Sequence, residues 1–146
     1  MRPFLRRAAA FSCLGILTMV ALASPVQAAR PAAAPAWQLI DNQQKTCYVS
    51  TRGDTNYYGI WLSGAWSHQI NVGADQLPAG GSYYTFYAPV PPGTSDGIGS
   101  LAYVAVVLPV GAAVGTYTAS LWASDAGTTE AVPITLVVNA SSCAHY

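Results

Sequence analysis

Charged residues are scarce in this sequence, which has six Lys and Arg and six Asp and Glu among its 146 residues. It has no cluster of Lys and Arg beyond its first few positions, so the composition argues against nucleic acids and anionic membranes as partners. It also has no zinc-ligand spacing, no nucleotide-binding motif and no pair of carboxylates in a setting for acid–base catalysis. We therefore expect no enzyme, no cofactor and no metal site.

Half of the basic residues gather at the start of the chain. Arg2, Arg6 and Arg7 precede an apolar run over residues 11–23, and Val26-Gln27-Ala28 forms a small-residue cleavage pattern. The apolar run is short for a membrane span, which needs about 20 residues. We therefore predict a signal peptide over residues 1–28, secretion to the extracellular space, and no membrane attachment after cleavage. The mature chain would carry three basic against six acidic residues, a formal charge of −3.

The segment after the predicted cleavage site lacks core-forming residues. Residues 29–36 read Ala-Arg-Pro-Ala-Ala-Ala-Pro-Ala, which is typical of a tether. No second linker and no internal repeat follows, so residues 37–146 are expected to form one domain.

Cysteine is also rare. Cys13 would leave with the signal peptide, so only Cys47 and Cys143 would remain. Two cysteines in an oxidising compartment most simply form a structural disulfide. Free buried thiols and a redox pair are the alternatives, and no C-x-x-C spacing supports the redox pair.

No segment of the mature chain has an apolar period of 3.6 residues, so we expect almost no helix. Instead, short runs of β-branched and aromatic residues alternate with Gly, Pro, Asn and Asp turns, the pattern of an all-β sandwich. The expected strands are Trp37–Ile40, Thr46–Ser50, Tyr57–Leu62, Trp66–Val72, Tyr83–Val90, Leu101–Leu108, Thr116–Ser124 and Thr129–Val138.

Alternation predicts the buried faces of the last two strands. Tyr117, Ala119, Leu121 and Ala123 share one face, and Val132, Ile134, Leu136 and Val138 share another. Pro133 removes one ladder donor and should mark an edge position or a bulge. Leu101–Leu108 is apolar on both faces, so it is either a central strand covered on both sides or a strand with one contact surface.

The run Leu108-Pro109-Val110-Gly111, continuing to Gly115-Thr116-Tyr117, approaches the second-last strand, and Val132-Pro133-Ile134-Thr135-Leu136 lies in the last one. These segments resemble the terminal hairpin of bacterial immunoglobulin-like domains. The whole chain, with its early Cys47 and Pro91-Pro92-Gly93, also resembles a group of small secreted actinobacterial proteins of unknown function. The resemblance implies an immunoglobulin-like antiparallel sandwich of two sheets with about seven or eight strands, and it implies no activity.

Aromatic side chains are the strongest functional signal. Five of them fall on the expected outer faces of their strands: Tyr57, Trp61, Tyr83, Tyr87 and Trp122. Flat rings on a weakly charged secreted sandwich can stack on sugars or contact a protein. Ordinary packing within the sheets is the alternative, because Tyr and Trp favour strands in any case.

Other polar residues have plainer interpretations. His68 alternates with Trp66 and Ile70 and is expected to be hydrogen-bonded in or beside the core. His145, near the end of the chain, is expected to be solvated. Residues 94–97 have too few acids for a convincing calcium site, and we interpret them as a turn.

We therefore predict a secreted, non-catalytic binding or surface-interaction module, monomeric or weakly associating, with a protein or carbohydrate ligand. One alternative is a carbohydrate-binding module that uses the five aromatic residues. The other is a small secreted hydrolase using His68, or an enzyme inhibitor that displays the loop at residues 88–93.

Overall fold

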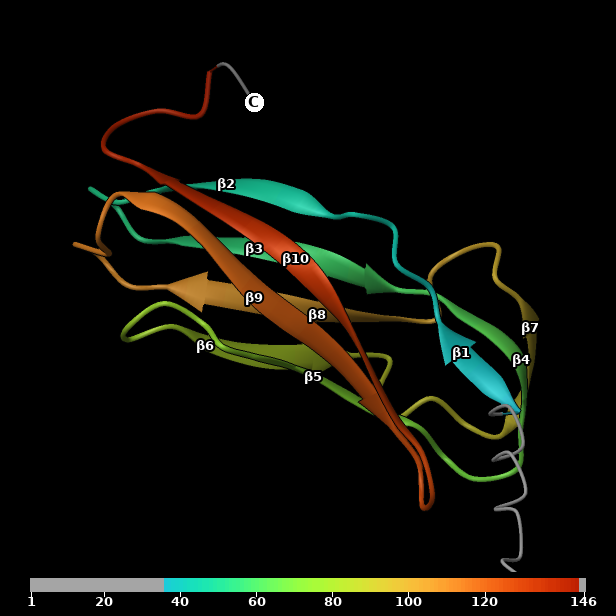
Figure 1. Cartoon of the computed structure of the whole chain (residues 1–146). Coiled ribbons are helices and arrows are strands. Elements are labelled where there is room, and N and C mark those ends of the chain that lie inside the picture. The colour runs from blue at the N-terminus through green and yellow to red at the C-terminus, as the bar shows by residue number, and fades with distance from the viewer. Residues whose placement is uncertain (1–35, 145–146) are drawn as a thin grey trace, which may run out of the picture. The chain divides into compact units, whose positions relative to one another are not determined.

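In the computed structural model, which describes residues 36–144, every regular element is a β-strand (Figure 1). The absence of helix from the described residues confirms the predicted all-β class. The strands are β1 (Trp37–Leu39), β2 (Lys45–Val49), β3 (Asp54–Ile60), β4 (Leu62–Trp66), β5 (Asn71–Asp75), β6 (Ser82–Phe86), β7 (Gly93–Asp96), β8 (Ala102–Leu108), β9 (Gly115–Ser124) and β10 (Thr129–Asn139). The predicted signal peptide, most of the tether and His145 lie outside the described residues.

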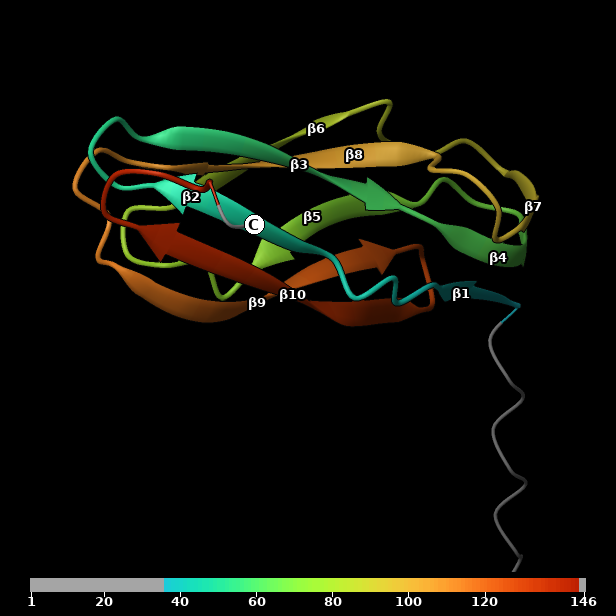
Figure 2. The ribbon, with the colours of Figure 1, turned by 90° about the horizontal axis from the view of Figure 1, so that it is seen from above.

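The strands form two stacked layers (Figure 2). One layer has the order β2-β10-β9-β5, and the other is built from β1-β4-β7 and β3-β8-β6. Because β3 runs directly into β4, and β7 leads into β8, these two short sheets continue one another. The layer that contains β5, β9 and β10 then matches the C-F-G sheet of the immunoglobulin fold, and the other layer matches the A-B-E-D sheet. The predicted immunoglobulin-like sandwich is confirmed, with β2 added parallel to β10.

The core lies between the layers, and alternate side chains of the last two strands fill part of it. Ala119, Leu121 and Ala123 of β9 are buried, as are Ile134 and Leu136 of β10. The predicted faces are therefore correct. Pro133 pairs with β9, while β2 joins β10 only from Thr135 onward, so the proline lies where the β2 side of β10 has no paired strand. This confirms the predicted edge position.

Several of the expected strand assignments are wrong. The run Tyr57–Leu62 is divided, because β3 ends at Ile60 and Leu62 begins β4. The run Trp66–Val72 is not one strand, because β4 ends at Trp66 and residues 67–70 carry the chain to β5 in the other layer. β6 ends at Phe86 rather than at Val90, since Tyr87 has a left-handed backbone with φ 55°. Residues 93–96 form β7, which pairs with β4, where a turn was expected. The extra strands raise the number from the expected seven or eight to ten.

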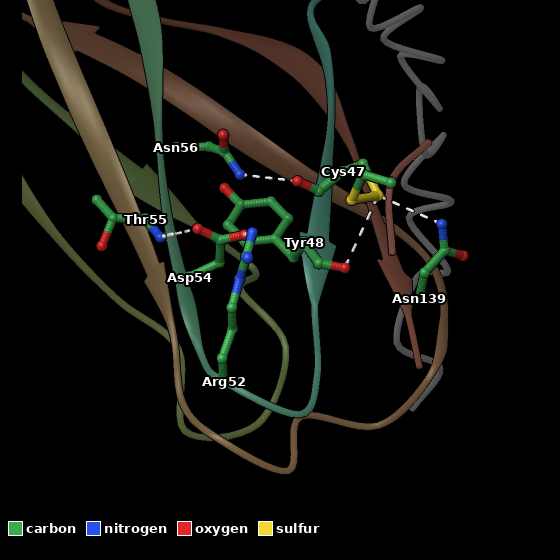
Figure 3. Close-up of polar contacts among 8 residues, drawn as sticks. Cys47, Tyr48, Arg52, Asp54, Thr55, Asn56 and Asn139 are labelled. Atoms are coloured by element: carbon green, nitrogen blue, oxygen red, sulfur yellow. Dashed lines mark hydrogen bonds and ion pairs between the residues drawn. A yellow bond between two sulfur atoms is a disulfide. The ribbon is translucent and has the colours of Figure 1, made fainter. Parts of the chain in front are cut away.

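The disulfide between Cys47 and Cys143 is present, as predicted, with a Cα–Cα distance of 5.8 Å (Figure 3). It fixes the segment after β10 to β2. Asn139 Nδ2 donates to Cys47 Sγ at 3.3 Å, and Asn56 Nδ2 donates to the Cys47 carbonyl at 2.9 Å. Neighbouring strands therefore hold the bridge from both sides.

The same end of the core contains two buried tyrosines. The hydroxyl groups of Tyr48 and Tyr58 are 3.2 Å apart, and Thr46 Oγ1 completes the group by bonding Tyr58. Burial raises the pKa of both phenols, because the charged form would lose its hydration. Each buried hydroxyl group has a partner, so the group links β2 to β3 without an unsatisfied polar atom.

Candidate functional site

The outer face of the β3-β8-β6 sheet is the most distinctive surface of the domain. Its centre is Ala105 of β8, which lies directly between Tyr57 of β3 and Tyr84 of β6. Ala105 is fully buried although it is on the outer face, whereas Tyr57 and Tyr84 are exposed. The small alanine therefore leaves room that the flanking phenol rings cover.

A second row of rings lies beside the first. Phe86 pairs with Tyr103 across β6 and β8. The ring of Phe86 is 5.2 Å from that of Tyr84 and 5.7 Å from that of Tyr57. Such centroid distances are typical of interacting aromatic pairs.

Tyr87 completes an open concavity on this face. Its ring lies 6.4 Å from that of Tyr103, and its side chain is 79% exposed. Together with Tyr57 and Phe86, these two rings line a hollow of about 310 Å³. The φ of 55° at Tyr87 is costly for a bulky residue, and such outliers cluster at functional sites.

Trp61 extends the row at the end of β3. An added Cβ on Gly59 would lie 2.4 Å from Cη2 of Trp61, so the indole ring rests on the outer side of Gly59. Gly59 itself pairs with Tyr103. We call the six residues on this side of the sheet the aromatic face: Tyr57, Trp61, Tyr84, Phe86, Tyr87 and Tyr103.

The structure places three of the five predicted ligand residues on the aromatic face: Tyr57, Trp61 and Tyr87. Tyr83 does not share this face, because it pairs with Val106 and has the inward parity of β6. Its hydroxyl group instead lies near Gly73 of β5, on which the Trp122 ring also rests. Tyr83 and Trp122 therefore meet over Gly73, on the outer face of the β2-β10-β9-β5 sheet, and not on the aromatic face.

Sequence reasoning missed Tyr84, Phe86 and Tyr103. In β6, the wrong set of alternate residues was taken to point outward. Four aromatic residues occur within Tyr83–Tyr87, so either alternate set fits an outer face. The signal that could have identified these outward rings is the small residue beside them in the sheet. Ala105 and Gly59 stand next to Tyr84 and Tyr103 in the sheet, but only the strand register reveals those neighbours.

The polar atoms of the aromatic face are mainly phenol hydroxyl groups. Hydrogen bonding to Tyr57 raises the pKa of Tyr84 above its ordinary value. None of the six residues carries a charge at neutral pH, so the face offers apolar rings with hydroxyl groups at their ends.

His68 is exposed in the loop after β4, so the expectation of a histidine in or beside the core is wrong. The chain crosses between layers there, which interrupts the alternation from which the burial was inferred. Ser67 Oγ lies 3.2 Å from His68 Nδ1. The nearby Asp125 carboxylate instead accepts hydrogen bonds from Trp37 Nε1 and from the backbone N–H groups of Gly127 and Thr128. Asp125 therefore stabilises the turn in which it lies.

The loop at residues 88–93 was the candidate for an inhibitor. Val90 is buried and forms a bridge with Ile70, and the Pro91 carbonyl accepts a hydrogen bond from Trp66 Nε1 at 2.7 Å. The middle of this segment is therefore anchored on the sandwich, while Pro89 and Pro92 are exposed.

Across residues 36–144, no group of three or more His, Cys, Asp or Glu side chains is arranged to hold a metal ion. The same part of the chain contains no helix long and apolar enough to cross a membrane.

Comparison with known proteins gives a family without an assigned activity. The solved structures that are similar in part include the following two. A chimeric titin Z1Z2 functionalized with a KLER exogenous peptide from decorin has 16% identity and a TM-score of 0.40, over 75% of this chain and 99% of that one. Domains 4 and 5 of the S-layer protein SbsC have 16% identity and a TM-score of 0.35, over 68% of this chain and 51% of that one, about half its length.

No curated protein matches the chain. A family model does match, and it covers residues 38–140, which include all but the first residue of the ten strands. The chain belongs to the family described as "Family of unknown function (DUF5980)".

Proposed function

We propose that this protein is a secreted, non-catalytic binding domain and that the aromatic face is its contact surface. The observation that carries the proposal is the gathering of six aromatic side chains on one outer sheet face, four of which line a hollow of about 310 Å³. Soluble proteins rarely expose contiguous apolar patches without a binding role. Tyrosine and tryptophan are also the residues most enriched among the energetically dominant contacts of interfaces.

The geometry favours a protein partner with apolar side chains. The three interacting ring pairs have interplanar angles of 46°, 69° and 62°, so they do not form one flat platform. Stacking on a polysaccharide would favour parallel rings and nearby Asn, Gln or Asp side chains. Tilted rings around a hollow instead suit an inserted aliphatic or aromatic side chain.

Secretion is supported by the disulfide, which persists in oxidising compartments. The predicted signal peptide and the low charge of the sequence agree with this location.

Selection of random peptides on phage, using the immobilised disulfide-bonded domain, tests the contact surface. We expect the selected peptides to be rich in aromatic and aliphatic residues. Their affinity should fall by about 2 kcal/mol, roughly 30-fold, in Tyr57→Ser, because truncation of a central aromatic contact has this typical cost. Isothermal titration calorimetry measures the difference.

Val114→Ser is the matched control, since Val114 is also an exposed apolar residue but lies in the loop before β9. Equal loss of affinity in both variants, or no loss in either, would refute the aromatic face as the contact surface. Sedimentation of the domain with cellulose or chitin, abolished by Tyr57→Ser, would replace the protein partner with a carbohydrate.

A further inference from the structure

One edge of the sandwich has an unpaired backbone. Within residues 36–144, β6 pairs only with β8, and its other side has no strand partner. Unpaired N–H and C=O groups on such an edge can accept another strand. This edge directly adjoins the aromatic face, because Tyr84 and Phe86 belong to β6.

The register shows which backbone groups point outward. The Gln44 side chain bonds both N–H and C=O of Gly59, so these two groups point away from β8. The opposite residue, Tyr103, must then direct its own backbone groups toward β6, because directions alternate along antiparallel strands. It follows that Phe86 and Tyr84 bond β8, and that Tyr83 and Thr85 present their N–H and C=O groups to the open edge.

The other edge of this sheet, β3, is blocked at Gly59. On β3, the Gln44 amide occupies the main-chain groups of Gly59. The β6 sequence Ser-Tyr-Tyr-Thr-Phe has no charged residue and no proline, which are the usual devices that prevent pairing between sheet edges.

We propose that two copies of this chain pair antiparallel through their β6 strands. A register centred on Tyr84 places Tyr83 of each copy opposite Thr85 of the other, and so uses every outward group in about four hydrogen bonds. The strand carries no charge, so the copies do not repel one another along this edge. The pairing would join two aromatic faces into one surface, and it does not depend on what that surface binds.

This register makes a geometric prediction about Tyr84. The two Tyr84 residues form a non-hydrogen-bonded pair with Cα atoms about 4.5 Å apart, within the roughly 4.4–6.8 Å that a disulfide spans. We expect Tyr84→Cys to form a covalent dimer under mild oxidation, seen on a non-reducing gel. Tyr57→Cys is the matched control, since Tyr57 is exposed on the same face but belongs to β3.

Thr85→Pro tests the hydrogen bonds without adding a thiol. Proline removes an outward N–H group, and edge positions of this kind tolerate it. Sedimentation equilibrium should show a reversible wild-type dimer whose association weakens about tenfold or more in the variant, the factor expected for losing one or more net hydrogen bonds. Circular dichroism checks that the variant folds.

The two experiments can each overturn the proposal. A wild-type protein that stays monomeric at all soluble concentrations would exclude the dimer. Equal cross-linking of Tyr84→Cys and Tyr57→Cys, or a dimer unaffected by Thr85→Pro, would exclude pairing through β6.

Discussion

Trp37 Nε1 donates a hydrogen bond of 2.7 Å to Asp125 Oδ2, and this contact joins the first strand to the turn between β9 and β10. Oδ1 of the same carboxylate accepts the backbone N–H groups of Gly127 and Thr128. One side chain therefore closes the hairpin and fixes the indole of Trp37, which is almost fully buried.

The ionised form of Asp125 should stabilise the fold. The hydrogen bonds from Gly127, Trp37 and Thr128 lower the pKa of this carboxyl group. A lowered pKa gives stability that is fully present above the unfolded value of about 3.9 and is lost as the pH falls through the folded value. We expect Asp125→Asn to be less stable than wild type at pH 7, and the difference to shrink below pH 4. Urea unfolding from pH 7 to pH 2 measures both. Trp37→Phe loses the donor and leaves part of the indole's volume empty, so it should be less stable at every pH, and the part of its loss that disappears at low pH should be smaller than in Asp125→Asn. A pH-independent difference in Asp125→Asn would contradict this account.

The disulfide should contribute much of the stability of the domain. It joins residues 96 positions apart, and a loop of this length gives roughly 4–5 kcal/mol in the loop-entropy model. We expect the double variant Cys47→Ser and Cys143→Ser to lose up to that amount in urea unfolding while keeping its β-sheet spectrum. A loss below about 1 kcal/mol would show that the bridge does not constrain the unfolded chain as the model assumes.

Gly59→Ala should displace Trp61 from the aromatic face. The new Cβ would lie 2.4 Å from the indole, so the ring must move, at a cost of about 1–3 kcal/mol. We expect a red shift of the tryptophan emission that is absent when Trp61→Phe is also present. Gly127→Ala is the control, because nothing lies within 4 Å of the added Cβ. An unchanged spectrum and stability in Gly59→Ala would contradict the position of the ring.

Tyr87 has a strained backbone conformation and an exposed ring. Its left-handed conformation suits Asn better than a bulky residue, and the ring itself gains little burial. We expect Tyr87→Asn to leave stability unchanged or to raise it by about 1 kcal/mol, while weakening the peptides selected on the aromatic face. A thermal unfolding scan measures the stability. A marked loss of stability would show that the ring has a structural role.

Some of this protein was determined by the sequence alone. Strict alternation in the last two strands identified Leu121, Ile134 and Leu136 as core residues, because a period of two leaves only one face to bury. The pairing of Cys47 with Cys143 also followed, since no other cysteine remains after the predicted signal peptide.

The tertiary structure decided the arrangement of the surface. Alternation cannot choose between Tyr83 and Tyr84 as the outward residue in a run of aromatics. That choice depends on pairing with Ala105, which is distant in sequence. Likewise, the apparent strand from Trp66 to Val72 divides between two layers, because local pattern does not record where a chain changes sheets. The aromatic face exists because Gly59 leaves space for the Trp61 ring, and because Ala105 leaves space for the rings of Tyr57 and Tyr84, which only the register brings together.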